Sequence, residues 1–243
     1  MKKVGLTWLL LIALIAIGVS AGINSQTYLP IAYRQPTPTA TQAIPPTQEP
    51  YPYGVQYLPD INLYTSGSLI HILGEVLNNT SDSLFGVGVG ADFYDAYGQL
   101  QGGSVAIMTP LDLPAGERGC FEIMMNEPDT WSYYELEPVT YTLGTSSAGL
   151  IILEHAGAYD IDTGSYGITG QVRNDGDQIS LNVSVGGTLY DADHMPVGCE
   201  FILVDSQDLN TGQGSYFTLD YSGSTRDYLD VTEYRLRVTG DIY

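Results

Sequence analysis

The sequence has 243 residues, of which 44% are hydrophobic, and a formal net charge of -20 at pH 7. This length leaves room for two small domains after a leader, and this hydrophobic share argues against wholesale disorder. Because 28 acidic residues stand against 8 basic ones, the surface repels nucleic-acid phosphates and anionic lipids, which argues against both as partners. The same charge can concentrate cations or basic ligands, or can serve solubility alone.

Residues 1–23 are typical of an export leader. Lys2 and Lys3 form a basic start, Leu6 to Val19 is almost wholly apolar, and Val19-Ser20-Ala21 offers the small residues that a signal peptidase reads. Cleavage leaves a secreted chain, whereas retention leaves an anchored one, since the segment is about long enough to span a bilayer. In both cases the sequence predicts a position outside the cytoplasm, with membrane contact only through this segment.

Residues 24–55 are predicted to be a linker. The stretch from Arg34 to Gly54 is dense in Pro and Thr and nearly free of aliphatic residues. Such a composition favours an extended polyproline-like stalk, which at about 3.1 Å per residue reaches roughly 65 Å. A plain disordered spacer fits the same composition equally well.

Two copies of one unit follow the linker. Shifting the chain by 96 positions aligns residues 74–121 with 170–217 without a gap, and 14 of these 48 positions are identical, against about three by chance. The matched positions include Gly74, Val76, Asn78, Val87, Val89, Tyr94, Asp95, Ala96, Leu113, Gly116 and Phe121. We therefore expect two domains, at 56–146 and 147–243.

Hydrophobic residues within each copy recur with a period of two, as strands require. In Leu84 to Tyr94 the predicted core face holds Val87, Val89, Ala91 and Phe93; in the second copy it holds Val183, Val185, Gly187 and Leu189, with Asn182, Ser184, Gly186 and Thr188 exposed. Similar alternation predicts strands through Ile70-Ile72, Tyr166-Ile168, Val105-Ile107, Phe201-Leu203, Tyr141-Leu143 and Tyr234-Leu236. Six or seven short strands per copy predict an all-β fold of two tandem immunoglobulin-like antiparallel β-sandwiches.

Three motifs of the first copy carry a resemblance to a family. The segments Gly74-Glu75-Val76-Leu77-Asn78, Asp92-Phe93-Tyr94-Asp95-Ala96 and Leu113-Pro114-Ala115-Gly116, followed by Phe121, resemble the bacterial FxLyD domain family. The second copy is similar but more diverged, and the phenylalanine that names the family is Ala91 in one copy and Gly187 in the other. The resemblance covers most of residues 56–240. It implies an extracellular β-sandwich without a defined activity, so it assigns no functional residue.

No catalytic constellation is recognisable in the sequence. His71, His155 and His194 lie in three separate elements without a shared motif, and the first two are expected to have structural hydrogen-bonding roles. The sequence contains no nucleophile elbow, zinc-binding helix, P-loop or dinucleotide fingerprint. A secreted carbohydrate-active hydrolase, or an accessory module of one, remains the enzyme alternative, because a pair of carboxylates cannot be recognised from sequence.

Calcium is the one cofactor that the sequence suggests. Asp160 with Asp162, and Asp175 with Asp177, place carboxylates at alternate positions near turns, as hard cations prefer. Turn formation explains the same residues, because Asn-Asp-Gly tolerates positive φ. Asp95 and Asp191 are interpreted first as residues that cap turns.

The two cysteines, Cys120 and Cys199, are candidates for one disulfide. They occupy different copies, so a bond between them joins the domains and fixes their angle. Against the bond, alternation places Cys120 opposite in parity to Phe121 and Cys199 on the same face as Phe201, so that one thiol is outside and the other buried.

Aromatic residues are the remaining candidates for binding. Trp131, Tyr133 and Tyr134 form one cluster in a chain with 19 tyrosines, and such side chains offer flat contacts with polar tips. Core coverage is the competing interpretation. The sequence thus predicts a non-catalytic surface or secreted module that binds a protein or glycan, adheres or has a structural role in the cell envelope; the alternative is a pure spacer.

Overall fold

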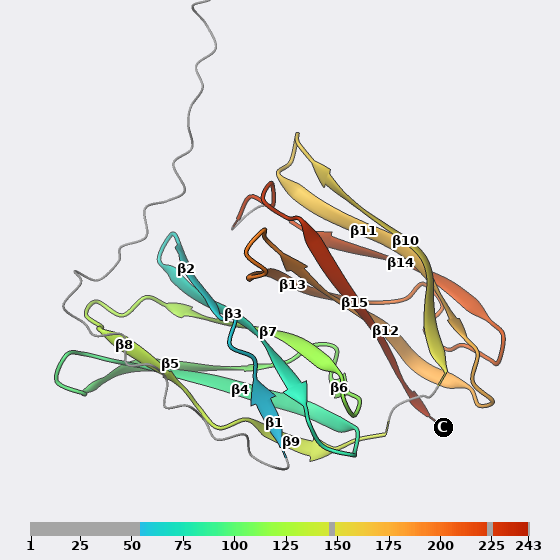
Figure 1. Ribbon diagram of the computed structural model, residues 1–243, viewed down its shortest axis with the longest axis horizontal. Coiled ribbons are helices and arrows are strands. Elements are labelled where there is room, and N and C mark those ends of the chain that lie inside the picture. Colours follow the sequence, from blue (N-terminus) through green and yellow to red (C-terminus); the bar gives the residue numbers. More distant parts are fainter. Residues whose placement is uncertain (1–53, 146–148, 223–225, 243) are drawn as a thin grey trace, which may run out of the picture. The chain divides into compact units, whose positions relative to one another are not determined.

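The computed structural model describes residues 54–145, 149–222 and 226–242, which all belong to one compact unit spanning 36–243. The described residues contain strands and no helix, which confirms the all-β class (Figure 1). Within these ranges, no helix is long and apolar enough to cross a membrane. The predicted leader at 1–23 and almost all of the predicted linker at 24–55 lie outside the described residues.

The first sandwich consists of two antiparallel sheets, each built around one long central strand. In the β3 sheet, β3 pairs with β1, β2 and β7, and in the β4 sheet, β4 pairs with β5, β6, β8 and β9. The strands are β1 (Val55–Tyr57), β2 (Asn62–Ser66), β3 (Leu69–Asn78), β4 (Leu84–Tyr94), β5 (Leu100–Ile107), β6 (Asp112–Leu113), β7 (Arg118–Asn126), β8 (Tyr133–Leu136) and β9 (Thr140–Leu143).

The second sandwich is simpler and also has two antiparallel three-stranded sheets. The β11 sheet has the order β10-β11-β14, and the β12 sheet has the order β13-β12-β15. The strands are β10 (Leu150–Asp160), β11 (Ser165–Asn174), β12 (Ser180–Tyr190), β13 (Pro196–Leu203), β14 (Gly214–Tyr221) and β15 (Glu233–Ile242).

Each sandwich has its own hydrophobic core, formed by the faces that the period of two predicts. Phe93 and Phe121 lie in the first core, and Leu189 and Phe217 lie in the second. The predicted inward residues of β4 and β12 are all inaccessible to solvent, or nearly so. Alternation therefore identified the central strands and their inward faces correctly, because apolar side chains on one face of a strand pack against the facing sheet.

The predicted orientation is wrong for three strands at the margins. Val105 and Ile107 on β5, Phe201 and Leu203 on β13, and Leu143 on β9 point outward and are exposed. On β5 the small Ala106, between the two larger residues, packs against the core instead. Apolar side chains also occur on protein surfaces, so alternation alone does not identify the buried side of a strand.

The expectation of one exposed face on β12 is also wrong. Ser184, Gly186 and Thr188 are buried, whereas Asn182 is exposed as expected. Gly186 faces Pro110 of the first sandwich, and Ser184 forms a hydrogen bond with Thr239. The outward face of β12 is covered by the other sandwich, which no pattern within one copy indicates.

The duplicated asparagines have identical roles in the two sandwiches. The Asn78 side-chain amide donates hydrogen bonds of 2.8 Å to the carbonyls of Asp82 and Leu113. The Asn174 amide donates bonds of the same length to the carbonyls of Gln178 and Leu209. Both side chains are buried, so each asparagine connects the end of β3 or β11 to two separate segments of the chain through its amide hydrogens.

The duplicated turn residues are structural too. The Asp95 carboxylate accepts hydrogen bonds from the backbone amides of Tyr97 and Gln99, and Asp191 accepts the equivalent bonds from Asp193 and Met195. These bonds confirm the interpretation of both aspartates as turn caps. The shared residues thus define the fold and leave function to residues that differ between the copies.

We predict that Asn174→Ala lowers the free energy of unfolding by about 2–3 kcal/mol, because the buried amide makes two side-chain hydrogen bonds that alanine cannot replace. Urea unfolding followed by circular dichroism measures the change. Asn210→Ala is the control, since Asn210 is exposed and bonds only to Gln213. A loss in Asn174→Ala no larger than in the control would contradict the role assigned to the amide.

Candidate functional site

The candidate site is the junction where the β3 sheet of the first sandwich contacts the β12 sheet of the second. Strands β3 and β7 contact β13, β7 also contacts β12, and β6 contacts β15. His71, Leu73 and Glu75 occupy the outward face of β3 and are nevertheless buried. A sheet face that carries a histidine and a glutamate is therefore removed from water, so its polar groups need partners within the junction.

A disulfide crosses the junction. Cys120 on β7 is bonded to Cys199 on β13, with a Cα–Cα distance of 5.7 Å and a sequence separation of 79. The parity argument against this bond assumed that Phe201 and Leu203 face the core, but both are exposed. Cys199 therefore lies on the outward face of its sheet, as Cys120 does, and the two outward faces meet.

Arg237 on β15 forms a second connection between the sandwiches. Its guanidinium donates hydrogen bonds to the carbonyl oxygens of Asp112 and Pro110. Removal from water lowers the pKa of Arg237 to about 10, although the charges of Glu117 and Asp112 oppose this shift. Neutral carbonyls thus accept two hydrogen bonds from this guanidinium, which has five N–H donors in all.

Gly186 on β12 allows the backbone of the second sandwich to lie close to Pro110 of the first sandwich. A Cβ atom at position 186 would collide with the ring of Pro110. Proline rings and backbone cannot give way as the end of a flexible side chain can, so a larger residue here must push the sandwiches apart.

Further contacts hold the junction at its other end. The Asn62 amide donates a 3.0 Å hydrogen bond to the carbonyl of Pro196, and both residues are buried. The Arg226 guanidinium lies 5.4 Å from the centre of the Tyr64 ring, a cation–π distance. Tyr64 in turn stacks on His71 at 4.5 Å. The sandwiches are therefore connected by covalent, polar and aromatic contacts at several separate points.

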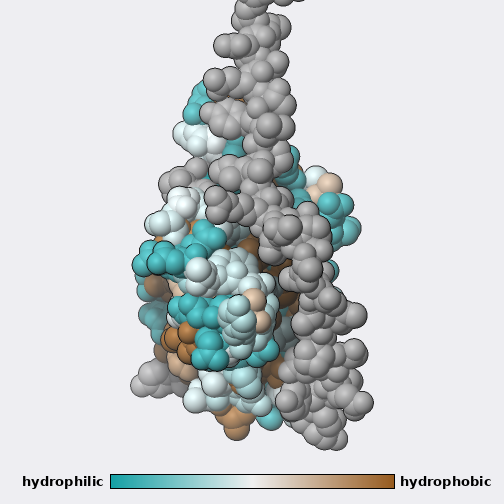
Figure 2. Space-filling model, turned by 90° about the vertical axis from the view of Figure 1, so that its left-hand side faces the viewer, coloured by the Kyte–Doolittle hydropathy of each residue, from teal (hydrophilic) through white to brown (hydrophobic). Residues whose placement is uncertain are grey.

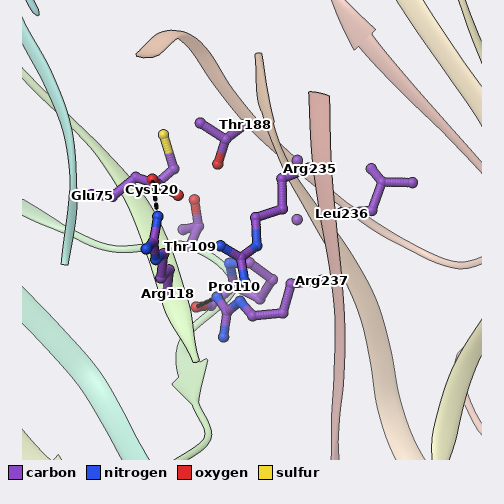
Figure 3. Close-up of a pocket in the computed structure, with 11 residues that line it drawn as sticks. Glu75, Thr109, Pro110, Arg118, Cys120, Thr188, Arg235, Leu236 and Arg237 are labelled. Carbon is purple, nitrogen blue, oxygen red and sulfur yellow. Dashed lines mark hydrogen bonds and ion pairs between the residues drawn. The ribbon is translucent and has the colours of Figure 1, made fainter. Parts of the chain in front are cut away.

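A small cavity lies within the junction and has arginines on both sides (Figure 3). Its volume is about 10 Å³, and it is lined by Glu75, Thr109, Pro110, Arg118 and Cys120 from the first sandwich and by Gly186, Gly187, Thr188, Arg235, Leu236 and Arg237 from the second. Sequence reasoning missed these arginines. The available signal was the spacing of Arg235 and Arg237, which places both on one face of a strand in a chain with only 8 basic residues.

Asp112 is a buried and incompletely hydrogen-bonded carboxyl at the edge of the junction. It is buried, and its Oδ1 atom has no hydrogen-bond partner among the described residues. Burial, and next the negative charge of Asp241, raise the pKa of Asp112 to about 6, while Arg237 opposes the shift. The ionised form is therefore disfavoured here relative to the unfolded chain.

The three histidines do not converge, and each has a local partner. His71 Nδ1 lies 2.7 Å from Glu122 Oε1, His155 Nδ1 lies 2.9 Å from the Tyr234 hydroxyl, and His194 Nδ1 lies 3.3 Å from Glu233. The expected hydrogen-bonding roles of His71 and His155 are confirmed.

The four aspartates proposed for calcium do not form one site. Asp160 and Asp162 lie at the start of β11 and Asp175 and Asp177 after its end, and a ten-residue strand is about 30 Å long. Asp160 accepts a hydrogen bond from the backbone amide of Asp162, and Asp175 forms an ion pair with Arg173. Across the described residues, no three His, Cys, Asp or Glu side chains are grouped as a metal would require.

The predicted aromatic cluster divides into covered and exposed members. Trp131 packs edge-on against buried Phe93 at 5.2 Å, and Tyr134 packs against the same ring at 5.8 Å. Burial raises the pKa of Tyr134 accordingly. These two residues cover the core of the first sandwich, so that Tyr133 is the one member of the predicted cluster whose side chain is exposed.

Tyr133 belongs instead to a small exposed platform with Tyr94 and Tyr97. Its ring stacks on Tyr94 at 5.2 Å with an interplanar angle of 17°, and Tyr97 in the adjoining turn is 89% exposed. Asp95 fixes that turn through its hydrogen bonds to the amides of Tyr97 and Gln99. On the face shown in Figure 2, hydrophilic residues predominate and hydrophobic ones form separate patches.

Comparison with known proteins adds little to this geometry. No protein-family model and no curated protein sequence matches the chain. Among solved structures, an exo-chitosanase of Amycolatopsis orientalis is 13% identical over 74% of this chain and 25% of its own, with a TM-score of 0.26. A red sea bream transglutaminase is 9% identical over 76% of this chain and 29% of its own, with a TM-score of 0.23. The chain spans under a third of each, and likeness at this level carries no argument about activity.

We predict that Asp112→Asn stabilises the protein at neutral pH and leaves it unchanged in acid. A carboxyl whose pKa rises from 3.8 to about 6 on folding contributes stability below pH 4 that is lost as the pH rises through 6. At pH 7.5 the variant should gain about 1–3 kcal/mol over the natural protein, and at pH 3.5 nothing. Thermal unfolding across this pH range measures the difference. Asp129→Asn, at an exposed site, should follow the natural profile; the same profile for Asp112→Asn would refute the assignment.

Proposed function

We propose that this protein is a non-catalytic exported module, at the cell surface or secreted, whose two sandwiches act as one rigid unit in a structural or adhesive role. The observation that carries the proposal is the junction. The disulfide between Cys120 and Cys199, the Asn62–Pro196 bond and the Arg237 bonds fix the two sandwiches at separate points. A pair fixed in this way transmits force and holds a constant orientation, which a flexible array of domains does not.

Export is supported by the same bond and by the sequence. Disulfides persist in oxidising compartments and are rare in the cytosol of most organisms. Residues 1–23 have the composition of a leader, and the Pro/Thr-rich stretch that follows them suits a stalk. Membership of the FxLyD family is part of this proposal and is supported by the duplicated G-x-V-x-N and Tyr-Asp segments, whose roles in both copies are structural.

The rigid-unit proposal is tested by rotational diffusion. ¹⁵N relaxation of the purified full chain should give the same overall correlation time for amides of the two sandwiches. The reason is that rigidly joined domains tumble as one body. The matched variant Cys120→Ser/Cys199→Ser shows how much of the coupling depends on the covalent bond. Two distinct and shorter correlation times in the oxidised natural protein would overturn the proposal.

The tyrosine platform favours a second candidate function, ligand binding by the first sandwich. At one end of β4 and β8, Tyr133 stacks on the half-buried Tyr94 and is exposed, as is Tyr97 in the adjoining turn. Tyrosine suits recognition of sugar rings or of flat protein side chains. The second copy has no equivalent, because Tyr190 is buried in the junction and position 193 is an aspartate. A spacer that carries no ligand has no need for such a platform.

We predict that Tyr97→Ala and Tyr133→Ala each weaken binding to soluble cello-, xylo- or chito-oligosaccharides by about tenfold, which corresponds to the loss of one aromatic contact. Titration followed by NMR of the platform amides measures the affinity. Tyr216→Ala, which removes a tyrosine that is 63% exposed on β14, is the matched control. If no oligosaccharide of the panel shifts these amides, the glycan version of the platform is wrong.

A further inference from the structure

The junction cavity gathers most of the positive charge in the described part of the protein. The sequence has no lysine after Lys3, and five arginines lie in the described ranges. Three of the five, Arg118, Arg235 and Arg237, line this one cavity. Figure 3 shows their guanidinium groups directed toward a common space, Arg118 from β7 and the other two from β15. In a chain with a net charge of -20, three convergent cations are a specific arrangement and not a general property of the surface.

The residues that line the cavity include three arginines and only one acidic residue, Glu75. Glu75 is buried, and its carboxylate lies 3.9 Å from the Arg118 guanidinium. Burial raises the pKa of Tyr190, and the hydrogen bond that the Tyr190 hydroxyl donates to Glu75 helps to raise it. Arg237 donates to backbone carbonyls, and the carboxyls near it belong to Glu117 and to Asp112, whose own pKa is raised to about 6. Glu75 is therefore the one carboxylate among the residues that line the cavity, while Glu117 and Asp112 lie near Arg237 without lining it.

Arg235 is the group that lacks a counterpart. Within the described residues it forms no hydrogen bond and no ion pair, and its charge opposes that of Arg237. Arg235 is exposed, so water screens part of its repulsion with Arg237, two residues away on the same strand face, and an anion beside both guanidinium groups lowers this repulsion further. A planar guanidinium offers a fork of N–H donors that matches the oxygens of carboxylate or sulfate.

We propose that this cavity is a binding site for one small oxyanion, a carboxylate or sulfate group, held by Arg235 and Arg237 with Arg118 opposite. The volume of about 10 Å³ is close to that of one water-sized group, so the cavity admits one oxygen of the anion while the rest lies at its mouth. Gly186 and Gly187 contribute only backbone atoms to the lining of the cavity. Because both sandwiches contribute arginines, the bound anion also stabilises the junction.

Sodium sulfate and sodium acetate are the probes, each compared with sodium chloride at the same ionic strength and applied to the full chain. NMR signals of the arginine Nε–Hε groups report binding directly, and thermal unfolding reports its effect on stability. We expect saturable shifts of the Arg235 and Arg237 signals and a rise in melting temperature beyond that in chloride, because a ligand of the folded state stabilises it. Response to sulfate alone identifies an inorganic or ester sulfate as the source, and response to acetate identifies a carboxylate.

Arg235→Gln should weaken the binding of either probe at least about tenfold, since it removes a charge-assisted contact. Arg173→Gln is the matched control, because it removes the same charge from a residue paired with Asp175 outside the cavity; its affinity should be unchanged. Without added anion, Arg235→Gln should melt no lower than the control, since it relieves repulsion with Arg237. The absence of saturable arginine shifts, or equal affinity in the two variants, would overturn the proposal.

Discussion

The burial of two polar sheet faces against each other is the constraint on which the rest of this structure depends. A face of β3 that carries His71 and Glu75 would ordinarily be solvated, yet it lies against the β12 sheet. Burying such groups is unfavourable unless they find partners. Glu122 lies beside His71, and Arg118 lies near Glu75. Arg237 donates hydrogen bonds to two carbonyl oxygens of the opposite sandwich. The polar pairs of the junction are therefore consequences of its position.

Most of the fold could be predicted because it is encoded locally. A period of two identifies β4 and β12 with their core faces, and a gapless repeat identifies two copies, since both signals lie in contiguous sequence. The junction could not be predicted in the same way. Which outward face is covered depends on contacts such as Arg237 with Pro110, whose partners are 127 residues apart in the chain.

The cysteines illustrate how an error in one strand propagates to the interpretation of a site. Alternation predicts that Phe201 and Leu203 face the core of the second sandwich, and therefore that the Cys199 thiol lies in that core. Both hydrophobic residues are exposed on β13, and the sulfur that shares their side of the strand reaches Cys120. Apolar side chains do occur on the surface, so their alternation locates a strand more reliably than it locates the buried side.

The way in which the two copies meet has a consequence for assembly. Through the repeat, the β3 sheet of the first copy corresponds to the β11 sheet of the second, and the β4 sheet corresponds to the β12 sheet. The junction therefore joins unlike faces, a head-to-tail contact of the kind that can extend into a filament instead of closing on itself. Extension needs the same residues on the free faces, but the counterpart of Cys120 is Tyr216 and that of Cys199 is Gly103. Divergence between the copies thus leaves the free faces without the cysteines that join the two sandwiches, so the covalent link is specific to this one junction.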